Sequence, residues 1–262
     1  MKGLQPSAAR EFMSRAGLAC LLAYAPVLHG CGASADPANE CAAATRMAIY
    51  FGSQDAGRLE LSASERAAIG LVMPVTGDAL CTGVVLPRGW VLTARHCDAG
   101  VPLLFGSSDA SAGRIAVTST KQHPEYDVML LELADGGTSS GVTPISLWSG
   151  LIDQSWVGVP ATLAGVGETQ TGALGALRFV DEPVTSVDDI EIRVDGAGKS
   201  GACGGDSGGP LLVAAEDGSA RVAGVLSRGS QSCVGIDAYT RVDRIREWVV
   251  AVIGSGRPSC GQ

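Results

Sequence analysis

The sequence predicts an all-β protein that carries one helix near its C-terminal end. Short apolar or alternating runs recur between turn residues along most of the chain, and many of its 36 glycines and 12 prolines separate them. Runs of this length and spacing favour a β-sandwich or β-barrels over repeated βαβ units. One longer segment, Arg241–Ile253, instead places Val242, Ile245, Val249 and Val252 on one face at helical spacing.

The candidate strands follow one another from residue 81 to residue 242. They are the runs at residues 81–86, 90–94, 101–106, 114–120, 127–133, 161–167, 177–184, 190–194, 210–215, 221–227 and 238–242. A short helix is also expected within residues 62–70, because Ser62 and Glu65 have the spacing of a capping box.

The composition argues against several classes of function. With 262 residues, the chain can hold one large all-β domain or two small ones. Its formal net charge of −8 and its 18% of charged residues leave no basic stripe for nucleic acid and no Lys/Arg cluster for an anionic membrane. No CxxC pair occurs, and only His96 and His123 lie beyond the N-terminal segment. We therefore expect neither a metal site nor a cofactor.

The N-terminal segment has the pattern of an export signal. Lys2, Arg10 and Arg15 precede a run of thirteen mostly apolar residues, 16–28, which is too short to span a bilayer but fits a signal-peptide core. Two processing sites compete. "LHGC", ending at Cys31, resembles a lipoprotein site, which would anchor the protein to the outer membrane, whereas "ASA" at residues 33–35 fits ordinary cleavage and secretion. We expect residues 1–35 to be the signal peptide and residues 36–46 a linker or pro-segment.

Export to an oxidising compartment would allow disulfides. The cysteines beyond the signal segment are Cys41, Cys81, Cys97, Cys203, Cys233 and Cys260. Six cysteines allow fifteen pairings, and their spacing alone does not choose among these.

The residue types needed for nucleophilic catalysis occur in separate segments. Ser207 lies in the glycine-rich stretch "GACGGDSGGP", and a serine hydroxyl needs a nearby base to become a nucleophile. His96 ends a strand-like run, whereas His123 lies in a turn-like "HPEYD"; either histidine taken alone fits a structural role equally well. Asp127 opens an apolar run, where a carboxylate is costly unless it meets a donor such as an imidazole N–H or remains solvated.

Taken together, these segments resemble the trypsin and chymotrypsin family of serine proteases. "LTARHC", "YDVMLLEL" and "GGDSGGP" carry its histidine, aspartate and serine in that order, and "CTGVVL", "LAGVGETQTG", "VLSRG" and "YTRV" extend the similarity from about Ile49 to Ile253. The resemblance implies two six-stranded antiparallel β-barrels with the active site in the cleft between them. It places the protease domain at residues 47–253, with barrels at about 47–150 and 151–240, a helix at 241–253 and a tail at 254–262.

The resemblance also implies residue roles. His96, Asp127 and Ser207 would form the catalytic triad, with Ser227 supporting Asp127 and the N–H groups of Gly205 and Ser207 forming the oxyanion hole. The implied disulfides are Cys81–Cys97 and Cys203–Cys233. Cys41 and Cys260 remain, and we expect them to pair with each other.

Three parts of the sequence depart from the family pattern. The usual Ile-Val-Gly-Gly amino terminus is missing, and its nearest analogue is "IYFG" at residues 49–52, shortly after Arg46. Cleavage within "TRMAIYFG" would free an ammonium group for Asp206, although ordinary linker proteolysis would look the same. Arg228 stands where relatives often carry a tryptophan beside the substrate backbone.

The third departure concerns the substrate pocket. Gly201 occupies the pocket-floor position, which is an aspartate in trypsin-like members, and Asp237 stands on the opposite wall. Ala202 and Gly229 leave space for a large side chain. We therefore expect cleavage after Arg or Lys, with a solvent-facing Asp237 as the alternative.

The expected function is that of an exported, monomeric serine endopeptidase acting on proteins or peptides. Its rival is a catalytically silent binding protein on the same fold. Such proteins usually lack a triad residue, whereas all three are present here.

Overall fold

The structure is a computed structural model in which residues 49–76, 80–107, 113–137, 141–172 and 174–255 are described. The expected signal peptide, the linker or pro-segment, the lipidation site Cys31 and the Cys41–Cys260 pair lie outside the described residues. No helix in the described ranges is long and apolar enough to cross a membrane.

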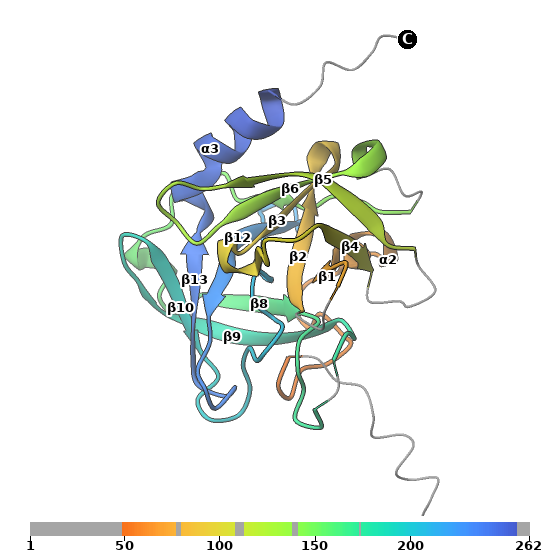
Figure 1. Ribbon diagram of the computed structural model, residues 1–262. Helices are drawn as coiled ribbons and strands as arrows, with labels where there is room; N and C mark the ends of the chain where they lie inside the picture. Colours follow the sequence, from red (N-terminus) through yellow and green to blue (C-terminus); the bar gives the residue numbers. More distant parts are fainter. Residues whose placement is uncertain (1–48, 77–79, 108–112, 138–140, 173, 256–262) are drawn as a thin grey trace, which may run out of the picture.

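The first barrel is closed by strands β1 to β6 in the order β1-β2-β3-β6-β5-β4 (Figure 1). Its strands are β1 (Ile69–Pro74), β2 (Cys81–Leu86), β3 (Trp90–Thr93), β4 (Leu103–Ser107), β5 (Ile115–Gln122) and β6 (Met129–Leu133). Every neighbouring pair is antiparallel. Four of the five residues of β6, which lies between β3 and β5 in the barrel wall, are buried.

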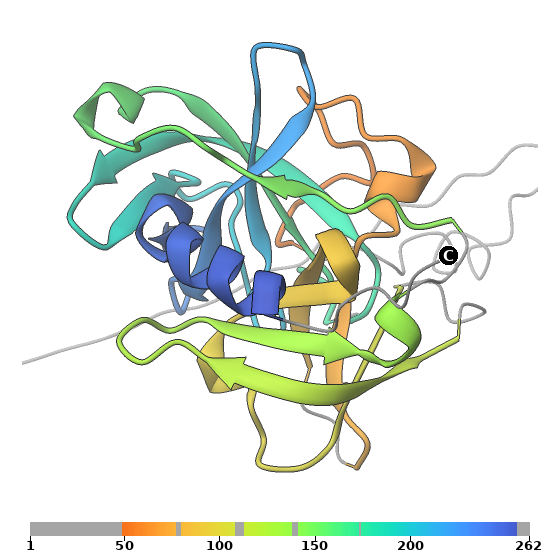
Figure 2. The same cartoon turned by 90° about the horizontal axis from the view of Figure 1, so that it is seen from above.

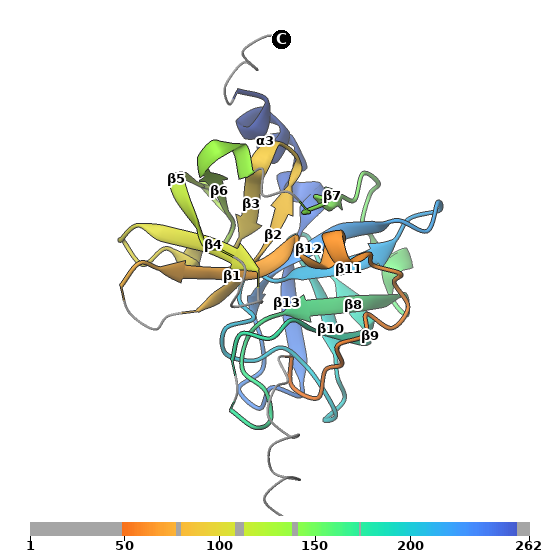
Figure 3. The same cartoon turned by 90° about the vertical axis from the view of Figure 1, so that its right-hand side faces the viewer.

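The second barrel lies beside the first (Figure 3). Its strands are β8 (Pro160–Gly165), β9 (Arg178–Val187), β10 (Glu191–Asp195), β11 (Pro210–Ala214), β12 (Ala220–Arg228) and β13 (Ile236–Arg241). They run in the order β11-β8-β9-β10-β13-β12, and pairing of β11 with β12 closes the ring. The short strand β7 (Ser146–Leu147) adds to β12 in parallel. The prediction of two six-stranded antiparallel barrels is confirmed.

Short helical elements connect the strands. They are α2 (Ala63–Arg66) and the 3-10 turns η1 (Pro87–Gly89), η2 (Arg95–Cys97), η3 (Ala134–Gly137) and η4 (Gln154–Trp156). The capping box that Ser62 and Glu65 predict is present at the start of α2.

The C-terminal helix α3 (Val242–Ser255) contacts both barrels, as predicted for a helix at this end (Figure 2). Ile245 and Val249 are buried at 0% and 2% exposure. The ring of Trp248 lies 4.9 Å from the ring of His123, which follows β5 of the first barrel. The helix therefore packs against residues of both barrels.

Two features differ from the sequence-based expectation. Strand β1 did not stand out as a candidate run, because Gly70 and Pro74 interrupt its apolar residues. The second concerns residues 49–53, since the expected start of the first barrel at residue 47 lies outside the described residues. Tyr50 and Ser53 pair with Gly201 and Phe179, which belong to the second half of the chain, because the backbone groups of this segment find their partners there.

Candidate active site

His96 is held in place by the short turn η2, directly after β3. The Cys81–Cys97 disulfide, with 6.2 Å between its Cα atoms, ties this turn to the start of β2. The second disulfide implied by the resemblance, Cys203–Cys233, is also present. The histidine loop is thus attached covalently to the barrel wall.

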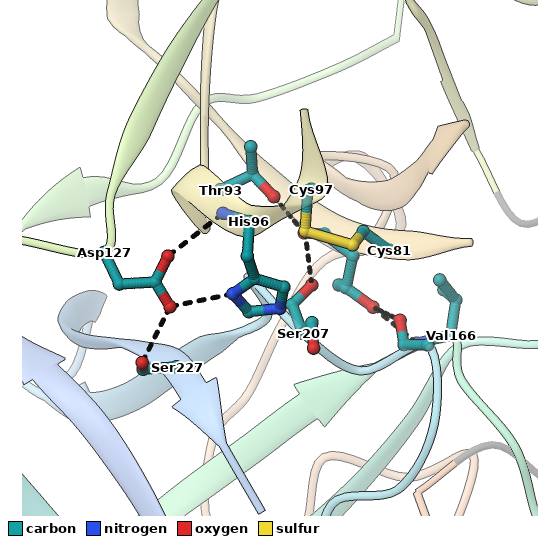
Figure 4. Close-up of a disulfide and its surroundings, with 10 residues drawn as sticks. Cys81, Thr93, His96, Cys97, Asp127, Val166, Ser207 and Ser227 are labelled. Carbon is teal, nitrogen blue, oxygen red and sulfur yellow. Dashed lines mark hydrogen bonds and ion pairs between the residues drawn. A yellow bond between two sulfur atoms is a disulfide. The ribbon is translucent and has the colours of Figure 1, made fainter. Parts of the chain in front are cut away.

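Asp127 binds His96 through two contacts. Its Oδ2 lies 2.8 Å from Nδ1 of the imidazole, and its Oδ1 accepts the backbone N–H of His96 at 3.0 Å. Ser227, at the end of β12, donates its hydroxyl to Oδ2 at 2.7 Å. Figure 4 shows the imidazole of His96 between Asp127 on one side and Ser207 on the other. The structure therefore brings together all four residues expected here.

The electrostatics of this pair favour a charged carboxylate beside a basic imidazole. Burial would raise the pKa of Asp127, but hydrogen bonds from His96 and Ser227 outweigh it and lower that pKa to about 2. The hydrogen bond to Asp127 raises the pKa of His96 above its usual 6.5, although partial burial acts in the opposite direction. Asp127 thus stabilises the protonated imidazole.

The loop that carries Ser207 is bonded to the first barrel through Thr82. The Thr82 N–H donates to the Ser207 carbonyl at 2.8 Å, and its hydroxyl donates to the Gly205 carbonyl at 3.0 Å. The Sγ atom of Cys97 lies 3.7 Å from the same Ser207 carbonyl oxygen. A Cβ atom at Gly208, whose φ is +81°, would lie 2.1 Å from Thr93 Oγ1. Only glycine lets the two barrels approach this closely.

Two backbone N–H groups of this loop point to an anion site. Asp206, Gly208 and Gly209 donate their N–H groups to protein carbonyls. Among the described residues, the N–H groups of Gly204, Gly205 and Ser207 have no protein acceptor. Gly205 adopts a φ of +92°, which reorients its peptide relative to its neighbours. Gly205 and Ser207 carry the two N–H groups that the family resemblance assigns to an oxyanion hole.

The expected pocket residues also lie together. Asp237 is fully buried rather than solvent-facing, and its carboxylate accepts the N–H groups of Ala202 at 2.6 Å and Ser230 at 3.2 Å. A Cβ atom at Gly201 or Gly229 would lie 3.1 Å or 2.8 Å from its carboxylate oxygens. Burial raises the pKa of Asp237 to about 6. The carboxylate therefore lies between the two glycines with no cation bonded to it among the described residues.

Asp206 is a second buried acid without a cation. It is 0% exposed, and its oxygens accept the N–H groups of Gly167 at 2.7 Å and Cys203 at 2.9 Å. Burial, and to a smaller extent the nearby Asp237, raise its pKa to about 7. This carboxyl group holds its proton to a much higher pH than Asp127 does.

The sequence analysis missed a third buried acid, Glu182 on β9. It is 2% exposed, and its Oε1 accepts the hydroxyl of Ser200 at 2.8 Å, next to Gly201. Burial raises its pKa to about 7. Residues 181–185 of β9 alternate between exposed and buried, and Glu182 falls on the inward face.

His123, the other histidine, has a structural role. Its Nδ1 accepts the N–H groups of Glu125 at 3.2 Å and Tyr126 at 3.1 Å, and its ring packs against Tyr126 and Trp248. Across the described residues, the one group of potential metal ligands is Cys81, His96 and Cys97, whose sulfurs are joined in a disulfide and cannot act as thiolates.

Known proteins with related sequences agree with this geometry. Residues 63–249 match the sequence model of the family described as Trypsin. Brachyurin from Leptuca pugilator is 30% identical over 207 residues, which cover 66% of this chain and 88% of that protein. A trypsin from Squalus acanthias is 28% identical, covering 68% and 88%. A snake venom serine protease from Crotalus durissus durissus is 25% identical, covering 74% and 85%. The chain belongs to the trypsin family and is a serine endopeptidase.

Proposed function

We propose that this endopeptidase hydrolyses peptide bonds of proteins or peptides through His96, Asp127 and Ser207. The observation that carries the proposal is the double contact of Asp127 with His96, at 2.8 Å and 3.0 Å. It directs the Nδ1–H of the imidazole toward the carboxylate, so that Nε2 is left to accept the proton of Ser207.

The proposed reaction has two halves. Ser207 Oγ attacks the scissile carbonyl carbon while its proton passes to Nε2 of His96. The carbonyl electron pair moves onto oxygen, where the N–H groups of Gly205 and Ser207 stabilise it by roughly 3 kcal/mol each. The imidazolium then gives its proton to the amine, the C–N bond breaks and an acyl-enzyme remains. Water repeats these steps to release the acid and restore Ser207.

Loss of the nucleophile tests this proposal. Ser207→Ala should abolish both peptide hydrolysis and labelling by a fluorophosphonate probe, whereas Ser155→Ala, at an exposed serine of the second barrel, should preserve both. If correctly processed parent protein failed to label, the catalytically silent binding role would be favoured instead.

We further propose that Asp237 directs cleavage after Arg or Lys. A carboxylate buried between Gly201 and Gly229, with backbone donors but no cation, would gain most from a guanidinium or ammonium entering the pocket. Asp237 is 0% exposed, so a substrate cation would have to approach its carboxylate past Gly201 and Gly229, where no Cβ atom stands in the way.

We also propose that activation requires cleavage within residues 46–49. Tyr50 is paired with Gly201 in both directions, at 2.9 Å and 3.3 Å, and Ile49 is 1% exposed. Ile49 has a φ of +52°, which is unfavourable for a β-branched residue. Breaking the peptide bond before Ile49 removes this torsion and supplies an ammonium group for Asp206. Amino-terminal sequencing of active enzyme is the test, and an active chain that still began before Arg46 would contradict it.

Export is the last part of the proposal. The two disulfides fit an oxidising compartment, and the basic and apolar N-terminal pattern fits a signal peptide. Fractionation of a Cys31→Ser variant distinguishes a lipid anchor from a secreted, monomeric enzyme. Mass spectrometry of an unreduced digest tests the Cys41–Cys260 pair.

A further inference from the structure

Arg228 occupies a position between two parts of the candidate active site. Its neighbour Ser227 donates to Asp127 at 2.7 Å. Its other neighbour, Gly229, borders the pocket, because a Cβ atom there would lie 2.8 Å from Asp237 Oδ1. A substrate whose side chain enters this pocket must therefore extend its preceding residues past Arg228.

The guanidinium of Arg228 is fixed by Glu191 of β10. Its Nη2 donates to Glu191 Oε2 at 2.7 Å, and its Nη1 donates to the other carboxylate oxygen. Glu191 also accepts Arg193 Nη2 at 2.6 Å, and the same nitrogen lies 2.8 Å from Asp188 Oδ2. Two arginines thus share one carboxylate in a network of four charged side chains.

The most exposed of the paired groups is the cation Arg228, so a peptide substrate would meet a positive charge here rather than a negative one. The side chain of Arg228 is 59% exposed, whereas that of Glu191 is 12% exposed and lies beneath it. A bidentate pair holds the guanidinium plane, so a ligand does not have to order it. Part of the guanidinium edge still faces solvent and can donate charge-assisted hydrogen bonds.

We propose that Arg228 is a specificity residue that binds an acidic side chain of the substrate, two to four residues before the scissile bond. Extended backbone advances about 3.3 Å per residue, so positions this close to the pocket lie within reach of an arginine side chain. Preferred substrates would combine an upstream Asp or Glu with the residue that the pocket accepts. The inference rests on the proposed peptidase function of the same site.

Peptides that share one residue at the scissile bond and carry Asp, Ala or Lys at each upstream position provide the test. We expect the ratio of kcat/KM for Asp over Ala to be about 3- to 5-fold at the best position, mainly through KM, as one exposed charged contact provides. Arg228→Gln should reduce this preference to less than 2-fold. Glu191→Gln should increase it, because the guanidinium loses its internal counter-charge.

Arg193→Gln is the matched control. It removes one positive charge from the same network, but Arg193 lies two strands away from Arg228, since Ala238 of β13 stands between the two arginines in the sheet. It should keep most of the preference for Asp. Fluorophosphonate labelling and kcat on the Ala peptide should be unchanged in Arg193→Gln.

The outcomes distinguish a failure of the role proposed for Arg228 from a failure of the proposed peptidase function. A parent enzyme that cleaves all peptides equally, or prefers an aromatic residue upstream, would overturn the role of Arg228 alone, as would an unchanged Asp preference in Arg228→Gln. Absence of both labelling and hydrolysis in the parent enzyme would overturn the proposed function, and the role of Arg228 with it.

Discussion

Asp127 and Asp206 are both aspartates of the same site, but their surroundings give them opposite character. Asp127 contacts the imidazole of His96 and a serine hydroxyl, and its pKa is lowered to about 2. Asp206 is fully buried with two backbone N–H donors and no described cation, and its pKa is raised to about 7. Backbone dipoles alone do not offset the cost of burying a charge, whereas a titratable partner and a hydroxyl do. Asp237 resembles Asp206 in this respect.

The largest expected effect comes from neutralising the first of these aspartates. Asp127→Asn should lower kcat by about 10⁴-fold, because the amide does not hold the imidazole in the tautomer that accepts the proton of Ser207. Steady-state kinetics with a saturating peptide measure this, with circular dichroism as the control for folding. A loss of less than tenfold would contradict the assigned role.

The raised pKa of Asp206 should make the stability of the folded protein depend on pH. An ordinary aspartate ionises near 3.8, whereas Asp206 holds its proton to about 7. The folded chain therefore binds more protons between these values, and its stability falls as pH rises through this window, by at most roughly 4 kcal/mol. Uncleaved precursor should lose Tm between pH 4 and 8.

Two forms of the protein serve as controls for this slope. Asp206→Asn precursor should show a shallower decline of Tm with pH, because the raised group is gone. Cleaved enzyme should show a shallower decline too, because an ammonium partner would lower the pKa of Asp206. The same slope in precursor and Asp206→Asn would show that another group is responsible.

The pocket aspartate should affect substrate choice more than turnover. Asp237→Ser should lower the ratio of kcat/KM for Arg over Phe substrates by about 10²-fold, the size expected when a buried charge pair loses one partner. In the parent enzyme this ratio should rise as pH increases through about 6, because Asp237 becomes charged. An unchanged ratio in the variant would mean that the pocket selects by shape.

The smallest effect concerns the hydroxyl that supports Asp127. Ser227→Ala removes one of several hydrogen bonds to the carboxylate, so we expect a loss of about 5-fold in kcat, equivalent to about 1 kcal/mol. Ser227→Thr, which keeps a hydroxyl, should recover part of the loss. Equal kinetics for Ala and parent would show that His96 alone fixes Asp127.

Much of the site could be predicted from local sequence because its parts lie in short, distinctive segments. The order of His96, Asp127 and Ser207 and the terminal helix follow from such segments, whereas the two disulfides were expected only from the family resemblance that these segments carry. Long-range partners could not be predicted in this way. The pairing of Tyr50 with Gly201 and that of Arg228 with Glu191 depend on how strands far apart in the sequence are placed beside one another.

The burial of an acidic residue and the presence of one strand could not be predicted from the sequence either. Glu182 lies in an alternating run whose inward face was not assigned, so nothing in its immediate neighbours marks it as a buried acid. Strand β1 was not predicted because Gly70 and Pro74 weaken its apolar run. It nevertheless forms a strand, since it pairs with β2 and β4 to close the barrel. Pairing with distant strands, rather than local β-propensity, determines both the burial of Glu182 and the formation of β1.

The hydrogen bonds of Thr82 oppose separation of the two barrels. Its N–H and hydroxyl join the first barrel to the carbonyls of Ser207 and Gly205, and it is completely buried. The barrels therefore cannot part without disrupting the loop that holds Ser207. Hydrogen exchange at the Thr82 amide should proceed only through global unfolding, and a covalent inhibitor on Ser207 should slow exchange in both barrels together.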